Sequence, residues 1–416
     1  MRGVGMQGER RATALALAGL ALLAVAALWA QAAHELWRSS VPAGLALPHV
    51  DPHRFFSASF LRRSSSYDRF LEIDRVLASL TLLVVLALYA RRGQRLMRES
   101  AAGRIGTGIL LALLGFAFVW LAELPFGLAA VWWERRHHVS HQGYLTSVLV
   151  SFLGLGSAFV FVALALAIAM GLAGRLRSWW ILATPLFAAL SLLSAFVSPF
   201  LIPKTHPLRN PAIAADARVL AAREGVPGTR VLVQTVSRSV TAPNAEAVGI
   251  GPTRRVVLWD TLLDGRFNRR EVGVVTAHEL GHIAHGHLLR RVGWLALFLL
   301  PATALVALAT RRRGSLARPE AVPLALFVFV ALQLLTLPLR TMVSRHEETE
   351  ADWSALQATR EPATARTLFE RLATTSLGDP DPPAWSYVLY ADHPTIAQRI
   401  GLTEAWQQRF SRTVSR

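Results

Sequence analysis

The residues best suited to chemistry are the run HELGH at positions 278–282, which is an HExxH motif. On a helix, residues four apart lie on one face, so the imidazoles of His278 and His282 can bind the same zinc ion. Glu279 lies beside them, where its carboxylate can take a proton from a metal-bound water. These residue types at this spacing indicate metal-assisted hydrolysis with one zinc ion per chain.

A zinc site of this kind needs a third protein ligand and leaves its fourth position to water. His285 lies near the same helical face, but three successive ligands on one straight helix would strain the tetrahedron, and we expect His287 to point to the opposite side. We therefore expect a carboxylate from another helix, and the candidates form one cluster: Glu347, Glu348, Glu350 and Asp352. Taken alone, the same cluster is also typical of a solvated acidic face.

Two polar segments, 204–291 and 344–416, must bring these groups together. In the first segment, apolar periodicity and β-branched runs predict two helices, over 211–224 and 269–289, and three extended stretches, at 230–236, 244–250 and 255–259. In the second segment, the pattern predicts helices over 344–360 and 362–374, a loop at 378–383, and a short terminal helix after Pro394.

The composition indicates an integral membrane protein. Of the 416 residues, 53% are hydrophobic and only 17% are charged, against about 25% charged residues in soluble domains, and the mean hydropathy is +0.37. About 20 apolar residues cross a hydrocarbon core roughly 30 Å thick. About seven stretches are candidate spans: 12–33, 76–90, 105–122, 142–174, 178–203, 292–310 and 321–339. The second is shorter than the others, and Leu71 and Ile73 extend it.

The first of these stretches has a second interpretation. Arg10 and Arg11, the apolar run after them, and the sequence Ala30-Gln31-Ala32 also resemble a secretory signal peptide with a small-residue cleavage site. The apolar run is longer than the 7–15 residues of an ordinary signal-peptide core. We therefore expect a retained span, with cleavage as the alternative.

The cysteine content and the charge distribution exclude several classes of function. The chain has no cysteine, which excludes thiol catalysis, cysteine-ligated zinc and iron–sulfur clusters. Its net charge of +17 raises the question of nucleic acid, but many arginines flank the spans instead of gathering on one soluble face. A second histidine cluster at residues 137–141 has only Glu134 nearby, and we interpret it as a loop between spans. No nucleic-acid partner is expected.

The stretches 277–287 and 344–352 (SRHEETEAD) together resemble the type I CAAX prenyl endopeptidase family and its bacterial membrane metalloprotease relatives. That family follows HExxH with a distal Ser-Arg-x-x-Glu-x-x-Ala-Asp segment. The resemblance implies that Glu348 is the third zinc ligand. It also implies that Asp352, one helical turn later, orients a ligating imidazole.

Further stretches extend the resemblance. Asn244-Ala245-Glu246 lies where the family has Asn-Ala-Tyr on an edge strand thought to pair with substrate, so all three are candidate substrate-binding residues. Glu246 replaces the family's tyrosine, which puts the contacts at that position in doubt. His393-Pro394 and the later Arg399 resemble the family's His-Pro…Arg segment, which implies that His393 lies near the metal. As a hypothesis, His393 donates a hydrogen bond to the reacting oxygen and Arg399 supports the ligands from behind. The alternatives are that His393 simply ends a loop and that Arg399 is an ordinary surface charge.

The expectation is a mostly α membrane protein in which about seven transmembrane helices accompany an α+β zincin-like metallopeptidase domain. The expected layout is a five-span region 1–203, the first peptidase part 204–291, a transmembrane hairpin 292–343, and the second peptidase part 344–416. The implied activity is that of an integral-membrane zinc metalloendopeptidase with Glu279 as general base. Its partners would be a peptide or membrane-protein substrate and the lipid bilayer. The alternative is a catalytically inactive multi-pass transporter or scaffold that retains the zincin domain.

Orientation in the membrane receives two conflicting predictions. The short loops rich in arginine place the N-terminus in the cytoplasm and the zinc domain outside. Resemblance to the prenyl endopeptidases implies the reverse, with the zinc site facing the cytosol. The near absence of lysine suggests a high-GC bacterial source and hence the bacterial cell membrane. Bacterial relatives handle other membrane-associated peptides, so the sequence does not predict a prenylated substrate.

Overall fold

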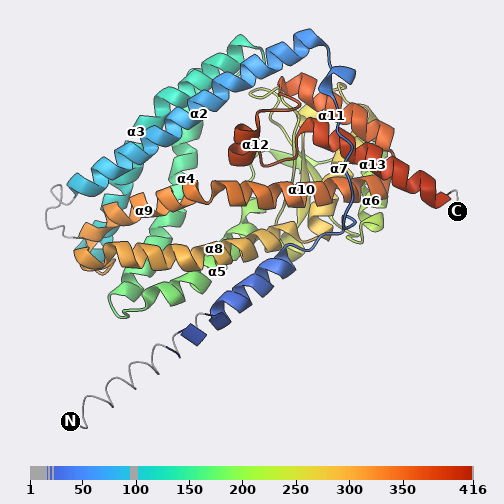
Figure 1. Cartoon of the computed structure of the whole chain (residues 1–416). Coiled ribbons are helices and arrows are strands. Elements are labelled where there is room, and N and C mark those ends of the chain that lie inside the picture. Colours follow the sequence, from blue (N-terminus) through green and yellow to red (C-terminus); the bar gives the residue numbers. More distant parts are fainter. Residues whose placement is uncertain (1–15, 17–18, 21–22, 94–101, 415–416) are drawn as a thin grey trace, which may run out of the picture.

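The computed structural model describes residues 16, 19–20, 23–93 and 102–414, and most of these residues are helical (Figure 1). Five described helices are long and apolar enough to cross a membrane. They are α2 (Ala58–Arg92), α3 (Gly103–Arg136), α4 (Tyr144–Ala173), α5 (Trp179–Val197) and α8 (His287–Thr310). Each contains or overlaps one of the predicted spans, and α2 extends well beyond the apolar stretch 76–90.

The sixth candidate span is a bent pair. Helices α9 (Val322–Leu335) and α10 (Leu337–Thr359) meet at an angle of 48° and pass the test for a span only together. The bend lies where Pro338 enters the first turn of α10, because proline cannot donate a backbone hydrogen bond to the preceding turn. The predicted span 12–33 lies partly outside the described residues. Residues 23–36 are helical, and the Trp29 indole donates to the Leu297 carbonyl of α8.

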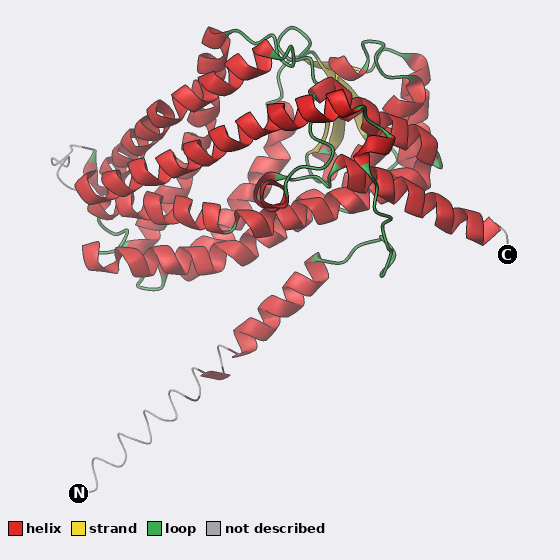
Figure 2. Ribbon diagram, turned by 45° about the horizontal axis from the view of Figure 1, so that its top comes forward, coloured by secondary structure: helices red, strands yellow, loops and turns green. Residues whose placement is uncertain are grey.

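A four-stranded sheet of order β1-β2-β4-β3 lies at one end of the molecule, surrounded by helices (Figure 2). The strands are β1 (Thr205–Pro207), β2 (Arg230–Gln234), β3 (Ala245–Val248) and β4 (Arg255–Trp259). Strands β2 and β4 are parallel, and the two outer strands pair antiparallel to them. The three predicted strands are present. Strand β1 was not predicted, because its three residues are too few to show a periodic pattern.

Helix α7 (Arg269–Ala284) begins at a complete capping box. The Asn268 side chain accepts from the amides of Arg270 and Glu271, and the Glu271 carboxylate accepts from the Asn268 amide. These bonds satisfy amides that have no partner inside the helix. The first helical turn is therefore fixed, and with it the direction in which the motif residues point.

The predicted helix over 269–289 is wrong at its C-terminal end. The chain leaves α7 after Ala284, passes through Gly286 in the left-handed conformation with φ of 64°, and starts α8 at His287. Glycine reaches that conformation without the steric cost that a Cβ brings. The break turns His287 in a direction that a continuous helix would not give.

Four further helices complete this end of the molecule, together with α7 and the second half of α10. They are α6 (Pro211–Arg223), α11 (Pro362–Ser376), α12 (Ala384–Tyr390) and α13 (Ile396–Val414). The predicted short terminal helix is α13, which has 19 residues, and α12 lies inside the stretch between the predicted loop and that helix.

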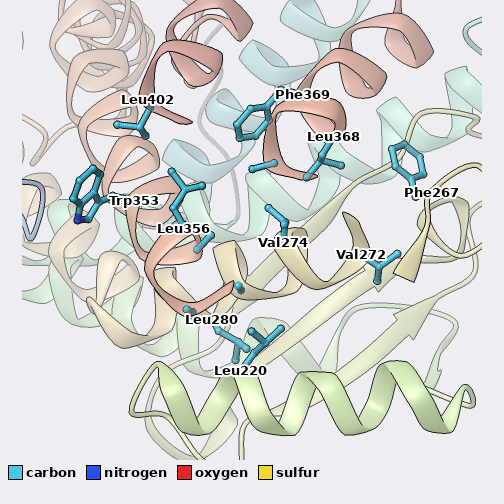
Figure 3. Close-up of a cluster of buried hydrophobic side chains, with 14 of the residues drawn as sticks. Leu220, Phe267, Val272, Val274, Leu280, Trp353, Leu356, Leu368, Phe369 and Leu402 are labelled. Carbon is cyan, nitrogen blue, oxygen red and sulfur yellow. The ribbon is translucent and has the colours of Figure 1, made fainter. Parts of the chain in front are cut away.

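The core at this end fixes α7 against α10, α11 and the sheet. Figure 3 shows buried side chains from several elements in one cluster: Leu220 of α6, Val272 and Leu280 of α7, Leu356 of α10, and Leu368 of α11. Burial of each such side chain contributes about 1.5–3 kcal/mol relative to exposure. The elements that carry the candidate site are therefore held by a continuous apolar core.

Gly281 sets the distance between α7 and α10. A Cβ built at this position would lie 3.1 Å from the Ser354 Cβ and 3.5 Å from the Ala351 Cα. We expect Gly281→Leu to push the two helices apart, lowering the free energy of unfolding by about 1–3 kcal/mol, as overpacking does. Thermal unfolding in detergent and zinc affinity both measure this, and an unchanged melting temperature with unchanged zinc affinity would contradict it.

Candidate metal and catalytic site

Three side chains converge at the contact between α7 and α10. The His278 Nε2 lies 3.1 Å from the His282 Nε2 and 3.1 Å from the Glu348 Oε2. The remaining distance, from the His282 Nε2 to the same Glu348 oxygen, is 3.4 Å. These are the residues that the sequence predicted as ligands, and within the described part of the chain they form the group of three suited to a metal ion.

The donor set fits zinc. Zinc bonds to imidazole nitrogen and carboxylate oxygen are about 2.0–2.1 Å long, so neighbouring ligands of a tetrahedral site stand about 3.3 Å apart. The three distances here lie close to that value. Two imidazole nitrogens and one carboxylate oxygen that face a common point are a donor set that could hold a divalent metal ion.

The second oxygen of Glu348 is held by α8. The Arg291 Nη2 donates to the Glu348 Oε1 over 3.2 Å, and the Arg291 Nε donates to the Glu347 Oε2 over 2.6 Å. This arrangement leaves the Glu348 Oε2 facing the two imidazoles. The sequence reasoning did not find Arg291, because it is one arginine among many and lies 57 positions from Glu348.

On its other side, the His278 ring contacts the carboxylate of Asp352. Its Nδ1 lies 2.9 Å from the Asp352 Oδ1, and Asp352 in turn accepts two hydrogen bonds from Arg399, of 2.8 Å and 2.7 Å. The Arg399 guanidinium and the His278 imidazole both favour the ionised carboxylate. A bidentate pair of this kind fixes the plane of the carboxylate and, through it, the plane of the imidazole.

Glu279 lies on the open side of the site, next to β3. The Ala247 amide hydrogen-bonds to its carboxylate. Burial raises the pKa of Glu279 above its ordinary value, although the charge of His278 opposes this. A general base is most effective when its pKa approaches the working pH, so this environment suits a proton acceptor.

The open edge of the sheet borders the same space. Register places Ala245 opposite Leu258 and Ala247 opposite Val256, and the Trp259 amide donates to the Asn244 carbonyl. In an antiparallel pair the backbone groups alternate in direction, so those of Ala245 and Ala247 turn away from β4. Burial raises the pKa of the Glu246 carboxyl, with a further contribution from Glu279.

His393 reaches the site from the loop after α12. Its Nε2 lies 3.2 Å from the Glu348 Oε2 and its Nδ1 lies 2.8 Å from the Asp392 Oδ1, while its side chain is half exposed. Desolvation alone would lower its pKa, but hydrogen bonds to Asp392 and Glu348 raise the pKa of His393 to about 9. This histidine is therefore suited to donate a hydrogen bond at the open side.

A single cavity of about 520 Å³ connects these groups. Its lining includes all three predicted ligands, Glu279, His393 and the edge-strand residues 244–247. Asp352 and Arg399 do not line it, which agrees with their position behind His278. The structure thus brings together every site residue that the sequence predicted.

Two further histidines lie close to the motif, and neither is placed as a metal ligand. His287 does not point away from the motif: its Nδ1 lies 2.7 Å from the His282 Nδ1, because the chain turns at Gly286. His285 hydrogen-bonds to Ser354 and lies 3.5 Å from Glu350. The separate cluster at 137–141 is a loop after α3, where the His137 Nδ1 contacts the Trp133 carbonyl.

Comparison with known proteins gives one family. Residues 207–407 match the sequence model of peptidase family M48. The chain is 29% identical over 238 residues to the uncharacterized metalloprotease YhfN of Bacillus subtilis, covering 54% of this chain and 56% of that protein. It is 26% identical over 250 residues to CAAX prenyl protease 1 of Saccharomyces cerevisiae, covering 53% of this chain and 54% of the yeast protein. The chain thus spans about half the length of these curated relatives.

The fold matches over a longer range. The crystal structure of S. mikatae Ste24p superimposes with a TM-score of 0.69, covering 91% of this chain and 96% of that one, at 17% sequence identity. This confirms the expected fold, a mostly helical multi-pass membrane protein with a small sheet beside its zincin-type helices. The resemblance drawn from the sequence is confirmed as well, since the matched family model, the curated relatives and the superimposed structure all point to CAAX prenyl protease-like proteins of peptidase family M48.

Proposed function

We propose that this chain is an integral-membrane zinc metalloendopeptidase, in which His278, His282 and Glu348 hold the metal. The observation that supports this most strongly is the spacing of 3.1–3.4 Å between their three donor atoms. Similarity to the model of peptidase family M48 supports a metallopeptidase in general terms, and the donor chemistry favours zinc among the divalent metals. The proposed setting is a bacterial cell membrane.

The chain's own residues then divide the work of hydrolysis. Zinc, when bound, supplies a Lewis acid that polarises the scissile carbonyl and lowers the pKa of water. Glu279 accepts the proton of the attacking water and passes it to the leaving amine. His393 donates a hydrogen bond to the oxygen on which negative charge develops, from its position beside the ligands, where its Nε2 lies 3.2 Å from the Glu348 Oε2.

The substrate is held by the open edge of β3. Backbone groups of Ala245 and Ala247 face away from β4, and since the Ala247 amide already donates to Glu279, an extended peptide can add to this edge through the Ala245 amide and the two carbonyls. Asn244 and Glu246 line the same cavity and would contact its side chains. Substrates of this kind are a flexible peptide or an extended segment of a membrane protein.

Backbone pairing at β3 gives a direct prediction. Ala245→Pro removes an amide that the register directs to the substrate, so we expect kcat/KM to fall about 5–10-fold, equivalent to one hydrogen bond of about 1 kcal/mol. Ala245→Val keeps the amide and is the matched control. Steady-state kinetics on one peptide measures both, and equal losses in the two variants would contradict strand addition.

The two-part layout of the peptidase domain is part of the proposal. Segments 204–291 and 344–416 form one domain, and the helices between them form a transmembrane hairpin. The ligands support this division, since His278 and Glu348 come from opposite sides of the hairpin. Helix α10 continues from the bent span into the site, which links the membrane region to the Glu348 backbone.

The proposed activity is tested by incubating the purified chain in detergent with a mixture of unmodified peptides. Mass spectrometry should find cleavage at internal bonds that is absent with Glu279→Gln protein purified in parallel. Cleavage confined to terminal residues would contradict an endopeptidase. Cleavage of equal extent by both proteins would contradict the assignment of Glu279.

A further inference from the structure

The metal ligand His282 has an unusual partner behind it. Its Nε2 faces the other two ligands, and its Nδ1 lies 2.7 Å from the Nδ1 of His287, not from a carboxylate. His287 is almost completely buried, and its Nε2 lies 3.0 Å from the Glu350 Oε2. A line of hydrogen bonds therefore runs from the metal site through two imidazoles to a buried carboxylate.

The directions of these hydrogen bonds follow from the two ends of the line. A ligating imidazole coordinates through an unprotonated nitrogen, so His282 carries its proton on Nδ1 and donates it to His287. His287 must accept at Nδ1 and is left with a proton on Nε2, which it donates to Glu350. Each nitrogen then has one role, and no donor faces another donor.

The far end of this line is firmly anchored. The Glu350 Oε1 accepts from the Ser40 amide over 2.5 Å, and its Oε2 accepts from Arg290 over 2.7 Å. Arg290 also donates to the Arg38 carbonyl, and the Trp37 ring stacks on His346. The segment 37–41 therefore covers Glu350 and restricts its rotation.

We propose that His287 and Glu350 are positioning residues for the metal ligand His282, fixing its tautomer and the plane of its ring. The inference rests on the proposed function, since it assumes that His282 ligates zinc. The two histidine ligands would then be supported by different groups. His278 is held directly by the Asp352 carboxylate, while His282 is held through a second imidazole, that of His287. The turn at Gly286 is what places that imidazole within reach.

The test compares zinc affinities of the full chain in detergent, measured by competition with a chelating dye. His287→Phe keeps a ring but removes both nitrogens, and we expect zinc binding to weaken about 10–100-fold. His287→Asn keeps an acceptor near the former Nδ1 and should lose less than His287→Phe. Glu350→Gln should also weaken zinc binding. His137→Phe is the matched control: this histidine contacts Trp133 and Tyr67 in the loop after α3 and no residue of the metal site, so zinc affinity should stay within about twofold of the unsubstituted chain.

A second readout separates positioning from general damage to the fold. Cobalt(II) substituted for zinc gives visible bands that report ligand geometry, and these should change in His287→Phe while thermal unfolding of the metal-free protein does not. Zinc binding by His287→Phe within about twofold of the unsubstituted chain would overturn the proposal, as would equal losses in His287→Phe and His287→Asn. If His287→Phe does not fold, Glu350→Gln and His287→Asn decide the matter. Failure of the unsubstituted chain to bind zinc would instead refute the proposed function.

Discussion

Glu279→Gln is expected to lower kcat for peptide hydrolysis about 10²–10⁴-fold while zinc affinity stays unchanged, because general-base catalysis contributes that factor. Glutamine keeps the size of the side chain and can still accept the hydrogen bond from the Ala247 amide. It cannot accept a proton from water. The measurement is single-turnover cleavage of one peptide, alongside zinc content of the same sample.

The matched control is Glu224→Gln, another glutamate replaced outside the site. Glu224 hydrogen-bonds to Ser354 on α10 and does not line the cavity. This variant should retain activity within a few-fold, since it changes neither ligand nor base. Cleavage by Glu279→Gln at the unsubstituted rate would show that another group takes the proton. If Glu279→Gln lost its zinc, the fall in kcat would come from the missing metal, and the expectation of unchanged zinc affinity would be wrong.

Glu348→Ala is expected to weaken zinc binding more than about 100-fold, beyond the 10–100-fold typical of residues that only orient a ligand. The change removes one of three donors and leaves Arg291 without its second carboxylate. Activity should fall with metal occupancy and recover in part at high zinc concentration.

Asp352→Asn provides the internal comparison, because it acts one step behind the ligand His278. It should weaken zinc binding about 10–100-fold, less than Glu348→Ala. Competition with a chelating dye ranks the two variants in one assay. A larger loss in Asp352→Asn, or no loss in Glu348→Ala, would contradict the assignment of Glu348 as the third ligand.

The local signals in the sequence predicted most of the architecture. Charge-free stretches predict spans because the bilayer demands about 20 apolar residues, and α3, α4, α5 and α8 follow them. Strand β4 follows its apolar β-branched run. Strand β1 has three residues, and no periodicity can be read from so few.

The end of α7 shows where local pattern fails. Apolar periodicity continues past Gly286, so the sequence predicted one helix through 289. Whether a glycine continues a helix or turns in the left-handed region depends on what packs on either side of it. Here the turn sends α8 toward the membrane region, and the position of His287 follows from that packing alone.

The site divides in the same way. His278 and His282 were predictable because four-residue spacing on a helix is a local property. Glu348 was predictable only through resemblance, since a cluster like its own is more often a solvated acidic face. Arg291 gave no signal, because its role depends on where α8 crosses α10 and not on its neighbours in the sequence.

The most direct test of the account is a titration of zinc into the metal-free chain with peptide cleavage as the readout. Dialysis against a chelator should remove activity, and added zinc should restore it linearly up to one equivalent per chain, followed by a plateau. The same titration of Glu279→Gln should take up one equivalent without activity. Full cleavage by the metal-free chain, or a plateau well beyond one equivalent, would contradict the account.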